Sequence, residues 1–214
     1  MDIQNLIFDL GNVIINIEPE LTIKAFSEFV PHKADLIRQE VLRSPFFHDF
    51  ETGRINNEQF REGIRAMYHA DLSDQEIDNA WNALLLDIPE SRLQLLDALK
   101  SSYRTFLLSN TNDIHVDFIV RQMEAQGQPA LNQLFEQVYY SQHMNMRKPD
   151  PSIYQYVLDQ NGLRAEETVF LDDNWDNIVS ARSLGIVSIH IEPQKNSMLD
   201  FFKPDLSLHY PLEA

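Results

Sequence analysis

Three short apolar runs, each ending at polar or acidic residues, constrain the fold of this chain most strongly. They are residues 6–8 before Asp9, residues 105–108 before Ser109, and residues 169–171 before Asp172. The residues within each run do not alternate between apolar and polar, which is typical of a strand buried on both faces of its sheet. Strands of this kind occur mostly in parallel sheets that helices cover on both faces.

Helical patterns separate these runs. Leucines stand at every third position over residues 93–99, and the Asp-Pro pair that opens residues 150–160 is typical of a helix N-terminus. Residues 138–140 and 186–191 are weaker candidate strands. Strands that alternate with helices predict an α/β fold with a doubly wound, Rossmann-like parallel sheet.

The predicted topology brings distant polar residues together. In open α/β sheets, ligands bind beyond the carboxyl ends of the strands. Asp9, Ser109 and the pair Asp172-Asp173 each follow or end a predicted strand. We therefore expect these side chains to meet at one edge of the sheet, although more than a hundred and fifty residues separate the first from the last.

Residues 18–89 break the alternation of strands and helices. This stretch has several helical patterns and no convincing strand, and Ser73 with Glu76 has the spacing of a capping box at a helix start. The predicted helices are residues 19–30, 33–42, 57–69 and 73–86. We therefore predict a catalytic core made of residues 1–17 and 90–214, into which residues 18–89 are inserted as a helical cap.

The charge balance restricts the class of partner. Lys and Arg total 17 against 33 Asp and Glu, and the net charge of -16 opposes binding to nucleic acids and to anionic membrane surfaces. A phosphorylated substrate is repelled as well, unless a lysine or a metal ion supplies positive charge locally. We expect a small-molecule partner, and neither nucleic acid nor membrane.

The chain contains no cysteine, which excludes disulfides, thiolate metal sites and cysteine nucleophiles. No run of 18 apolar residues occurs, and Asp2 stands where a signal peptide would carry Lys or Arg. A soluble, cytoplasmic protein is therefore expected. Whether the protein is a monomer or a homodimer is left open by the sequence.

The polar residues at the predicted strand ends supply the parts that phosphoryl transfer to a carboxylate needs. Such a reaction requires a nucleophile on a rigid strand end, a metal ion, a hydroxyl group and a cation for the phosphoryl oxygens. We assign these roles to Asp9 as nucleophile, Ser109 as hydroxyl donor and Lys148 as cation. Asp172 with Asp173 supplies the oxygen ligands that Mg²⁺ prefers.

Four ordered segments carry a resemblance to a known family. Phe-Asp-Leu-Gly-Asn-Val at 8–13, Leu-Ser-Asn-Thr at 108–111, Arg-Lys-Pro at 147–149 and Leu-Asp-Asp-Asn at 171–174 resemble the motifs of the haloacid dehalogenase-like superfamily. With the inserted cap, of the type called C1, the resemblance spans essentially the whole chain. The amino-acid sequences of the first and third segments are most similar to those of the bacterial subgroup that contains alpha-D-glucose-1-phosphate phosphatase.

The resemblance implies roles for the metal ligands. Asp9 would form an aspartyl-phosphate, while Asp9, the Asp173 carboxylate and the backbone carbonyl of Gly11 would bind Mg²⁺. Asp172 would support the water shell of the metal. The cap would close over the substrate and shield the acyl-phosphate from water.

The resemblance also implies which residues bind the phosphate group. Ser109 and Lys148 would contact its oxygens, and Asn110 would assist them. Arg147, beside Lys148, is a further candidate for substrate binding. Together these residues predict a phosphomonoester hydrolase acting on a small phosphorylated metabolite.

One departure from the family pattern bears on the substrate. Phosphatases of this superfamily usually carry a second Asp two residues after the nucleophile, where this chain has Gly11. A positioned acid is worth on the order of 10²- to 10⁴-fold in rate, so its loss favours a leaving group that is more acidic than an ordinary alcohol and departs more readily without protonation. The anomeric oxygen of a sugar 1-phosphate is such a group. His48 and Glu51 are candidates for replacing the acid from the cap.

Three other functions are compatible with this pattern of residues. A 2-haloacid dehalogenase also lacks the second Asp, but needs no magnesium, and the Asp172-Asp173 pair argues against it. A catalytically silent module that binds a phosphorylated ligand would account for Gly11. A phosphotransferase or mutase would pass the phosphoryl group from Asp9 to an alcohol instead of water.

Overall fold

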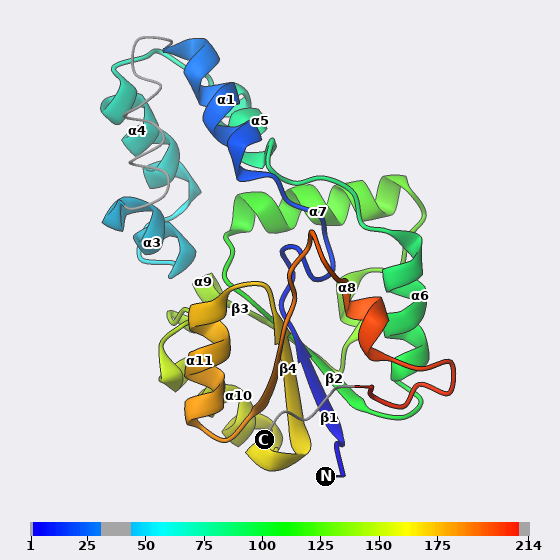
Figure 1. Cartoon of the computed structure of the whole chain (residues 1–214). Helices are drawn as coiled ribbons and strands as arrows, with labels where there is room; N and C mark the ends of the chain where they lie inside the picture. The colour runs from blue at the N-terminus through cyan, green and yellow to red at the C-terminus, as the bar shows by residue number, and fades with distance from the viewer. Residues whose placement is uncertain (1, 31–43, 210–214) are drawn as a thin grey trace.

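A five-stranded parallel sheet forms the centre of the molecule, in a computed structural model that describes residues 2–30 and 44–209. The strand order is β3-β2-β1-β4-β5, and every neighbouring pair is parallel (Figure 1). The strands are β1 (Asn5–Phe8), β2 (Arg104–Ser109), β3 (Gln137–Tyr140), β4 (Thr168–Asp172) and β5 (Val187–His190). The doubly wound α/β fold predicted from the sequence is confirmed, including its two weaker strands.

The register of the sheet sets the place of the polar residues. Phe8 of β1 lies opposite Leu107 of β2 and Leu171 of β4. Asp9 and Asp172 directly follow Phe8 and Leu171, and Ser109 stands two residues after Leu107, so all three lie at the same edge. The Asp9 amide donates to the carbonyl of Leu171 at 2.9 Å. The carboxyl ends of the three central strands converge as the sequence predicts.

Helices connect the strands and form the insertion. In the insertion they are α1 (Pro19–Phe29), α3 (Pro45–Glu51), α4 (Asn57–Tyr68) and α5 (Asp74–Asn82). In the core they are α6 (Glu90–Leu99), α7 (Asp113–Ala125), α8 (Leu131–Leu134), α9 (Ser141–Met144), α10 (Pro151–Asn161) and α11 (Trp175–Ser183), with 3-10 turns at Ala165–Glu167 and Met198–Phe201. Within residues 2–30 and 44–209, no helix has the length and apolar character needed to cross a membrane.

The predicted helices of the insertion differ from the structure in two places, and a third prediction is not tested. The helix predicted over residues 33–42 lies outside the described residues. The helix predicted over 73–86 ends at Asn82, because the chain then turns back towards the core, where Leu85 forms a β-bridge with Ile17. Helix α3 was not predicted: its seven residues are too few to show a helical period.

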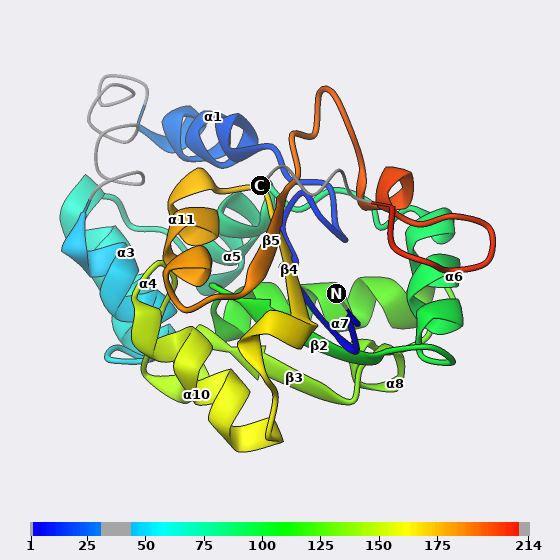
Figure 2. The same cartoon turned by 60° about the horizontal axis from the view of Figure 1, so that its bottom comes forward.

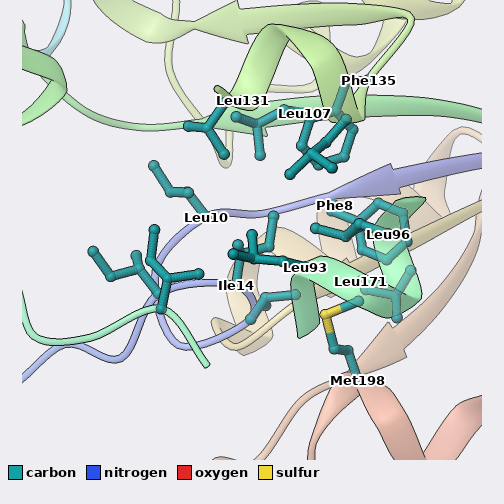
Figure 3. Packing of buried hydrophobic residues seen from close by; sticks show 14 of the residues in the cluster. Phe8, Leu10, Ile14, Leu93, Leu96, Leu107, Leu131, Phe135, Leu171 and Met198 are labelled. Carbon is teal, nitrogen blue, oxygen red and sulfur yellow. The ribbon is translucent and has the colours of Figure 1, made fainter. Parts of the chain in front are cut away.

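Helices cover both faces of the sheet, because successive strand residues point in opposite directions. Leu6 and Phe8 face the layer formed by α6, α7 and α8, whereas Ile7 faces α10 and α11. Figure 2 shows helices on both faces of the strands. Figure 3 shows the hydrophobic core between the sheet and the layer of α6, α7 and α8, in which Phe8 and Leu107 lie among leucines of α6 and α8.

The helical insertion, residues 18–89, has a hydrophobic core of its own. Phe47, Phe50, Phe60 and Trp81 pack ring against ring, with the centroids of Phe50 and Phe60 4.1 Å apart. The insertion lies beyond the carboxyl ends of the strands (Figure 1). This position is the one predicted for a cap, while the exact boundaries between cap and core remain predictions.

A buried network joins the insertion to the core between α5 and α7. The Asn112 side-chain oxygen accepts from Nε1 of Trp81 at 3.3 Å and from the His115 amide at 3.0 Å. The His115 ring stacks on Trp81, and its Nε2 donates to the Trp81 carbonyl at 3.2 Å. Its Nδ1 accepts from the side-chain Nδ2 of Asn112 at 3.1 Å. Both ring nitrogens of a neutral imidazole are thus satisfied.

We expect His115 to make the fold sensitive to acid. Burial lowers its pKa from 6.5 to about 4, so between these values the unfolded chain binds more protons than the folded one, and stability falls as pH drops. The loss through His115 is on the order of 3 kcal/mol. Urea unfolding of the native chain and of His115→Gln between pH 7.5 and 4 measures it: the difference in unfolding free energy should shift in favour of the variant as pH falls. A pH-independent difference would contradict the assignment.

Candidate active site

Lys148 is the centre of the candidate site. Its Nζ donates to Asp9 Oδ1 at 2.7 Å and to Asp172 Oδ2 at 2.6 Å. The Lys148 side chain is 1% exposed and that of Asp172 is fully buried. The lysine therefore joins the residue after β1 to the last residue of β4, two of the three central strand ends.

Asn110 holds the backbone of Lys148 in place. Its side-chain oxygen accepts from the Lys148 amide at 2.9 Å, and its Nδ2 donates to the Lys148 carbonyl at 2.8 Å. Ser109, the last residue of β2, is buried next to it. The structure thus brings Ser109 and Asn110 to the predicted edge of the sheet. The Asn110 amide binds Lys148, so its predicted role at the phosphoryl oxygens stays a prediction.

Asp172 is held on both of its oxygens. Asn177 donates its side-chain amide to both oxygens at 3.0 Å, and the Asn174 amide donates to Oδ1 at 2.7 Å. Because Lys148 binds Oδ2 as well, Asp172 has little capacity left for a metal ion. This arrangement makes Asp172 a support for Lys148 and agrees with an indirect part in metal binding.

Asp173 points towards the chain segment that follows Asp9. Its Oδ2 accepts from Nδ2 of Asn12 at 2.8 Å, and its backbone carbonyl accepts from Nε2 of His190 at 2.9 Å. Asn12 adopts the left-handed backbone conformation at φ 57°, a region in which Asn is favoured over most residues other than Gly. The turn after Asp9 therefore orients the second carboxylate of the Asp-Asp pair.

Burial and like charge perturb the titration of the site. Burial raises the pKa of Asp9 to about 7; Lys148 opposes this rise, and the neighbouring Asp172 carboxylate adds to it. Burial also raises the pKa of Asp173. Burial alone would favour the neutral amine of Lys148, but the carboxylates of Asp172 and Asp9 outweigh it and raise its pKa, so the lysine stays charged.

The donors present fit a divalent metal ion. One carboxylate oxygen of each of Asp9, Asp172 and Asp173 lies within 4.8 Å of the others, and of these Asp172 is the one already bonded on both oxygens. One lysine charge faces three carboxylates, so a buried excess of negative charge remains. Hard oxygen donors of this kind suit Mg²⁺, which is usually held by one or two carboxylates together with substrate oxygens and water.

Gly11 leaves a space that a neighbouring side chain partly fills. A Cβ atom added at Gly11 would lie 3.1 Å from Cδ1 of Ile17, and Gly11 does not have a positive φ. The backbone therefore permits another residue there once Ile17 gives way by a few tenths of an ångström. The missing acid is thus a matter of the side chain and not of backbone conformation.

His48 and Glu51, the candidates on α3 for replacing the missing acid, lie with Arg147 at one side of the site. Arg147 Nη2 lies 2.9 Å from Glu51 Oε2, so the guanidinium pairs with the insertion. His48 and Arg147 are among the residues that line a cavity of about 240 Å³ between α3 and the loop before α10. Substrate binding by Arg147 and acid catalysis by His48 or Glu51 remain predictions.

Sequence reasoning missed several residues that organise this site. Asn12 and Asn174 lie within the motifs, and Asn177 lies one helical turn beyond them. Sequence reasoning did not predict that Asn12 binds the Asp173 carboxylate, or that Asn174 and Asn177 bind that of Asp172. The excess of asparagine around two acidic motifs was the available signal. No sequence pattern indicated the contact between Arg147 and Glu51.

Comparisons with known proteins match the chain to a family of hydrolases. The chain matches the family model described as haloacid dehalogenase-like hydrolase over residues 3–185. It is 27% identical over 191 residues to a D-ribitol-5-phosphate phosphatase of Bacteroides thetaiotaomicron, covering 89% of this chain and 92% of the relative.

Solved structures are similar over nearly the whole chain. A HAD family enzyme from Bacteroides thetaiotaomicron, in complex with magnesium and inorganic phosphate, has a TM-score of 0.85 at 36% identity and covers 93% of this chain and 99% of its own. A predicted HAD-like family hydrolase from Porphyromonas gingivalis has a TM-score of 0.86 at 29% identity and covers 94% of this chain and 96% of its own.

We expect Mg²⁺ to stabilise the native chain through Asp173. At a hundredfold excess over the dissociation constant, the gain is about 2.7 kcal/mol, which corresponds to about 5–10 °C in melting temperature for a chain of this length. Thermal melts with and without MgCl₂ should show this shift in the native chain and in Asp176→Asn, whose carboxylate lies outside the metal cluster. Asp173→Asn should lose most of it. An equal shift in all three chains would contradict the assigned ligand.

Proposed function

The chain belongs to the haloacid dehalogenase-like hydrolase family, and from this membership we propose that it is a magnesium-dependent phosphatase of small phosphorylated metabolites with Asp9 as nucleophile. The observation that carries the proposal is the contact of Asp9 with Lys148 beside two further carboxylates. A similar enzyme that binds magnesium and inorganic phosphate together supports it. So does the activity named for the relative of 27% identity.

The carboxylates of Asp9 and Asp173, with the backbone carbonyl of Gly11, would hold the magnesium ion. The ion supplies positive charge that offsets the repulsion between Asp9 and a phosphate group. Asp172 would act through its contacts with Lys148 and with the solvent around the metal. The Asp9 pKa of about 7 makes this charge important, because positive charge nearby lowers that pKa and keeps the nucleophile ionised at neutral pH.

Hydrolysis would proceed in two steps on Asp9. In the first, a carboxylate oxygen of Asp9 bonds to phosphorus, and the bond to the leaving oxygen breaks with its electron pair. Lys148 and the Ser109 hydroxyl offset the charge on the phosphoryl oxygens. In the second, water attacks the aspartyl-phosphate, releases inorganic phosphate and restores the Asp9 carboxylate. The helical insertion over the strand ends would close on the substrate and limit the entry of stray water during the first step.

We propose that the substrate is a small sugar or polyol phosphate. We also propose that the protein acts in the cytoplasm. The name of the ribitol phosphate relative supports this class. The absence of an acid at Gly11 favours sugar 1-phosphates within it, because the anomeric oxygen leaves more readily without a proton than an ordinary alcohol does.

We expect the native chain to release phosphate from sugar and polyol phosphates with Mg²⁺, and to lose this activity by at least about 10³-fold in Asp9→Asn, because the nucleophile is removed. Phosphate release from sugar 1-phosphates, sugar 6-phosphates, ribitol 5-phosphate and nucleotides, with MgCl₂ or EDTA, measures it. An intact-mass measurement after rapid acid quenching should detect one phosphoryl group on the native chain and none on Asp9→Asn.

The outcomes separate the competing functions. Release that persists in EDTA, or in Asp9→Asn, contradicts the proposed mechanism. Halide release from 2-haloacids without magnesium, and no phosphate release, would identify a dehalogenase. Faster turnover of 6-phosphates than of 1-phosphates would overturn the leaving-group argument and leave the phosphatase assignment intact.

We expect an acid placed at position 11 to broaden the range of leaving groups. Gly11→Asp combined with Ile17→Val removes the methyl group nearest the new side chain and should raise kcat on 6-phosphates at least about tenfold, since a positioned acid protonates the alcohol. Turnover of p-nitrophenyl phosphate, whose leaving group needs no proton, is the internal control and should stay within about threefold. Equal changes for both substrates would show that the new carboxyl group does not act as an acid.

A further inference from the structure

Glu51, the last residue of α3 in the helical insertion, contacts the core through both its side chain and its backbone. Its carboxylate Oε2 lies 2.9 Å from Arg147 Nη2. Its backbone carbonyl accepts from Oγ of Ser141, the first residue of α9, at 2.6 Å. One residue of the insertion is thereby joined to two separate segments of the core.

The side-chain contact leads directly to the buried lysine of the site. Arg147 is the residue before Lys148, whose Nζ holds Asp9 and Asp172. The Arg147 and Glu51 side chains are 30% and 26% exposed, so this ion pair is more shielded from water than a surface pair. Removing one partner leaves the other as a partly buried, unpaired charge, which is costly.

The backbone contact leads to the other phosphate-binding segment. Ser141 Oγ, besides donating to Glu51, accepts from the Thr111 amide at 3.0 Å, two residues after Ser109. The turn after Glu51 is packed tightly at this point, because a Cβ atom on Gly53 would lie 2.3 Å from the carbonyl oxygen of Gln142. The end of α3 is therefore seated on the core at the start of α9.

The two segments are also tied to each other. The side chain of Asn110 donates to the backbone carbonyl of Lys148 and accepts from its backbone N–H. Glu51, Ser141, Asn110 and Lys148 thus belong to one connected network that begins in the insertion and ends at the proposed nucleophile. Contacts that are already present therefore connect α3 to Lys148.

We propose that Glu51 is a positioning residue for Lys148, and that its ion pair with Arg147 makes the catalytic lysine depend on the seating of the insertion; this inference rests on the proposed phosphatase function. Glu51 touches neither Asp9 nor the metal carboxylates in the contacts described. It acts on the reaction through Arg147. Arg147 therefore positions Lys148 in this scheme and does not bind the substrate.

The test is a double-mutant cycle with Glu51→Ala and Arg147→Ala, followed by phosphate release with Mg²⁺ from the best substrate of the panel. Each single variant should lower kcat about tenfold or more and leave KM within about threefold, because misplacing a catalytic group by an ångström can cost up to about 10²-fold. The double variant should lose no more than the worse single variant. Losses that multiply, or a raised KM with unchanged kcat in Arg147→Ala, would overturn the proposal.

Asp49→Ala is the matched control. Asp49 lies on the same helix and pairs with Arg54 within the insertion at 3.1 Å, so its loss removes a carboxylate of α3 without breaking the contact with the core. Its kcat should stay within about twofold of the native chain. A loss equal to that of Glu51→Ala would assign the effect to α3 as a whole and contradict a specific role of Glu51.

A second readout does not require activity. The Lys148 amide donates to Asn110 Oδ1, so hydrogen exchange in peptides covering residues 146–152 of the metal-free protein reports how firmly this segment is held. Exchange there should speed up about tenfold in Glu51→Ala and Arg147→Ala and stay unchanged in Asp49→Ala. If the native chain proves inactive, the proposed function fails, whereas unchanged exchange in Glu51→Ala makes the positioning inference fail.

Discussion

A lysine buried between two carboxylates organises the candidate site at the carboxyl ends of the strands. Lys148 is placed there by the loop before α10, and its charge is held by Asp9 and Asp172 at the ends of β1 and β4. Without that charge, neighbouring buried carboxylates could not remain ionised together. The surrounding asparagines complete the arrangement, since Asn110 fixes the lysine backbone and Asn177 fixes the Asp172 oxygens. The same cluster still carries an excess of negative charge, which is why a divalent ion fits beside it.

Two of the contacts between the helical insertion and the core differ in their chemistry. Between α5 and α7, Trp81, Asn112 and a neutral His115 form a buried hydrogen-bonded network. At the end of α3, Glu51 and Arg147 form an ion pair next to the lysine. The first contact depends on burial and on a fixed protonation state, and the second on opposite charge.

Much of the core could be read from the sequence because its pattern is local. The unbroken apolar runs gave the three central strands, and a parallel sheet leaves little choice about where their carboxyl ends lie. The capping box of Ser73 and Glu76 marked the start of α5 correctly, because such a cap needs only residues three apart. The end of α5 and the existence of α3 were missed. The first depends on where the chain rejoins the core, and the second on aromatic packing against Phe60 and Trp81.

The sequence by itself determined the parallel sheet, the convergence of Asp9, Ser109 and Asp172-Asp173, the family to which the chain belongs, and the absence of an acid at Gly11. These follow from residue identity and from spacing along the chain. Only the tertiary structure decided that Asn110 binds Lys148, that Asn12 orients Asp173, and that Arg147 faces Glu51. Such contacts join residues from different elements at distances set by packing. The direction of a side chain across an interface is not encoded in the local sequence pattern.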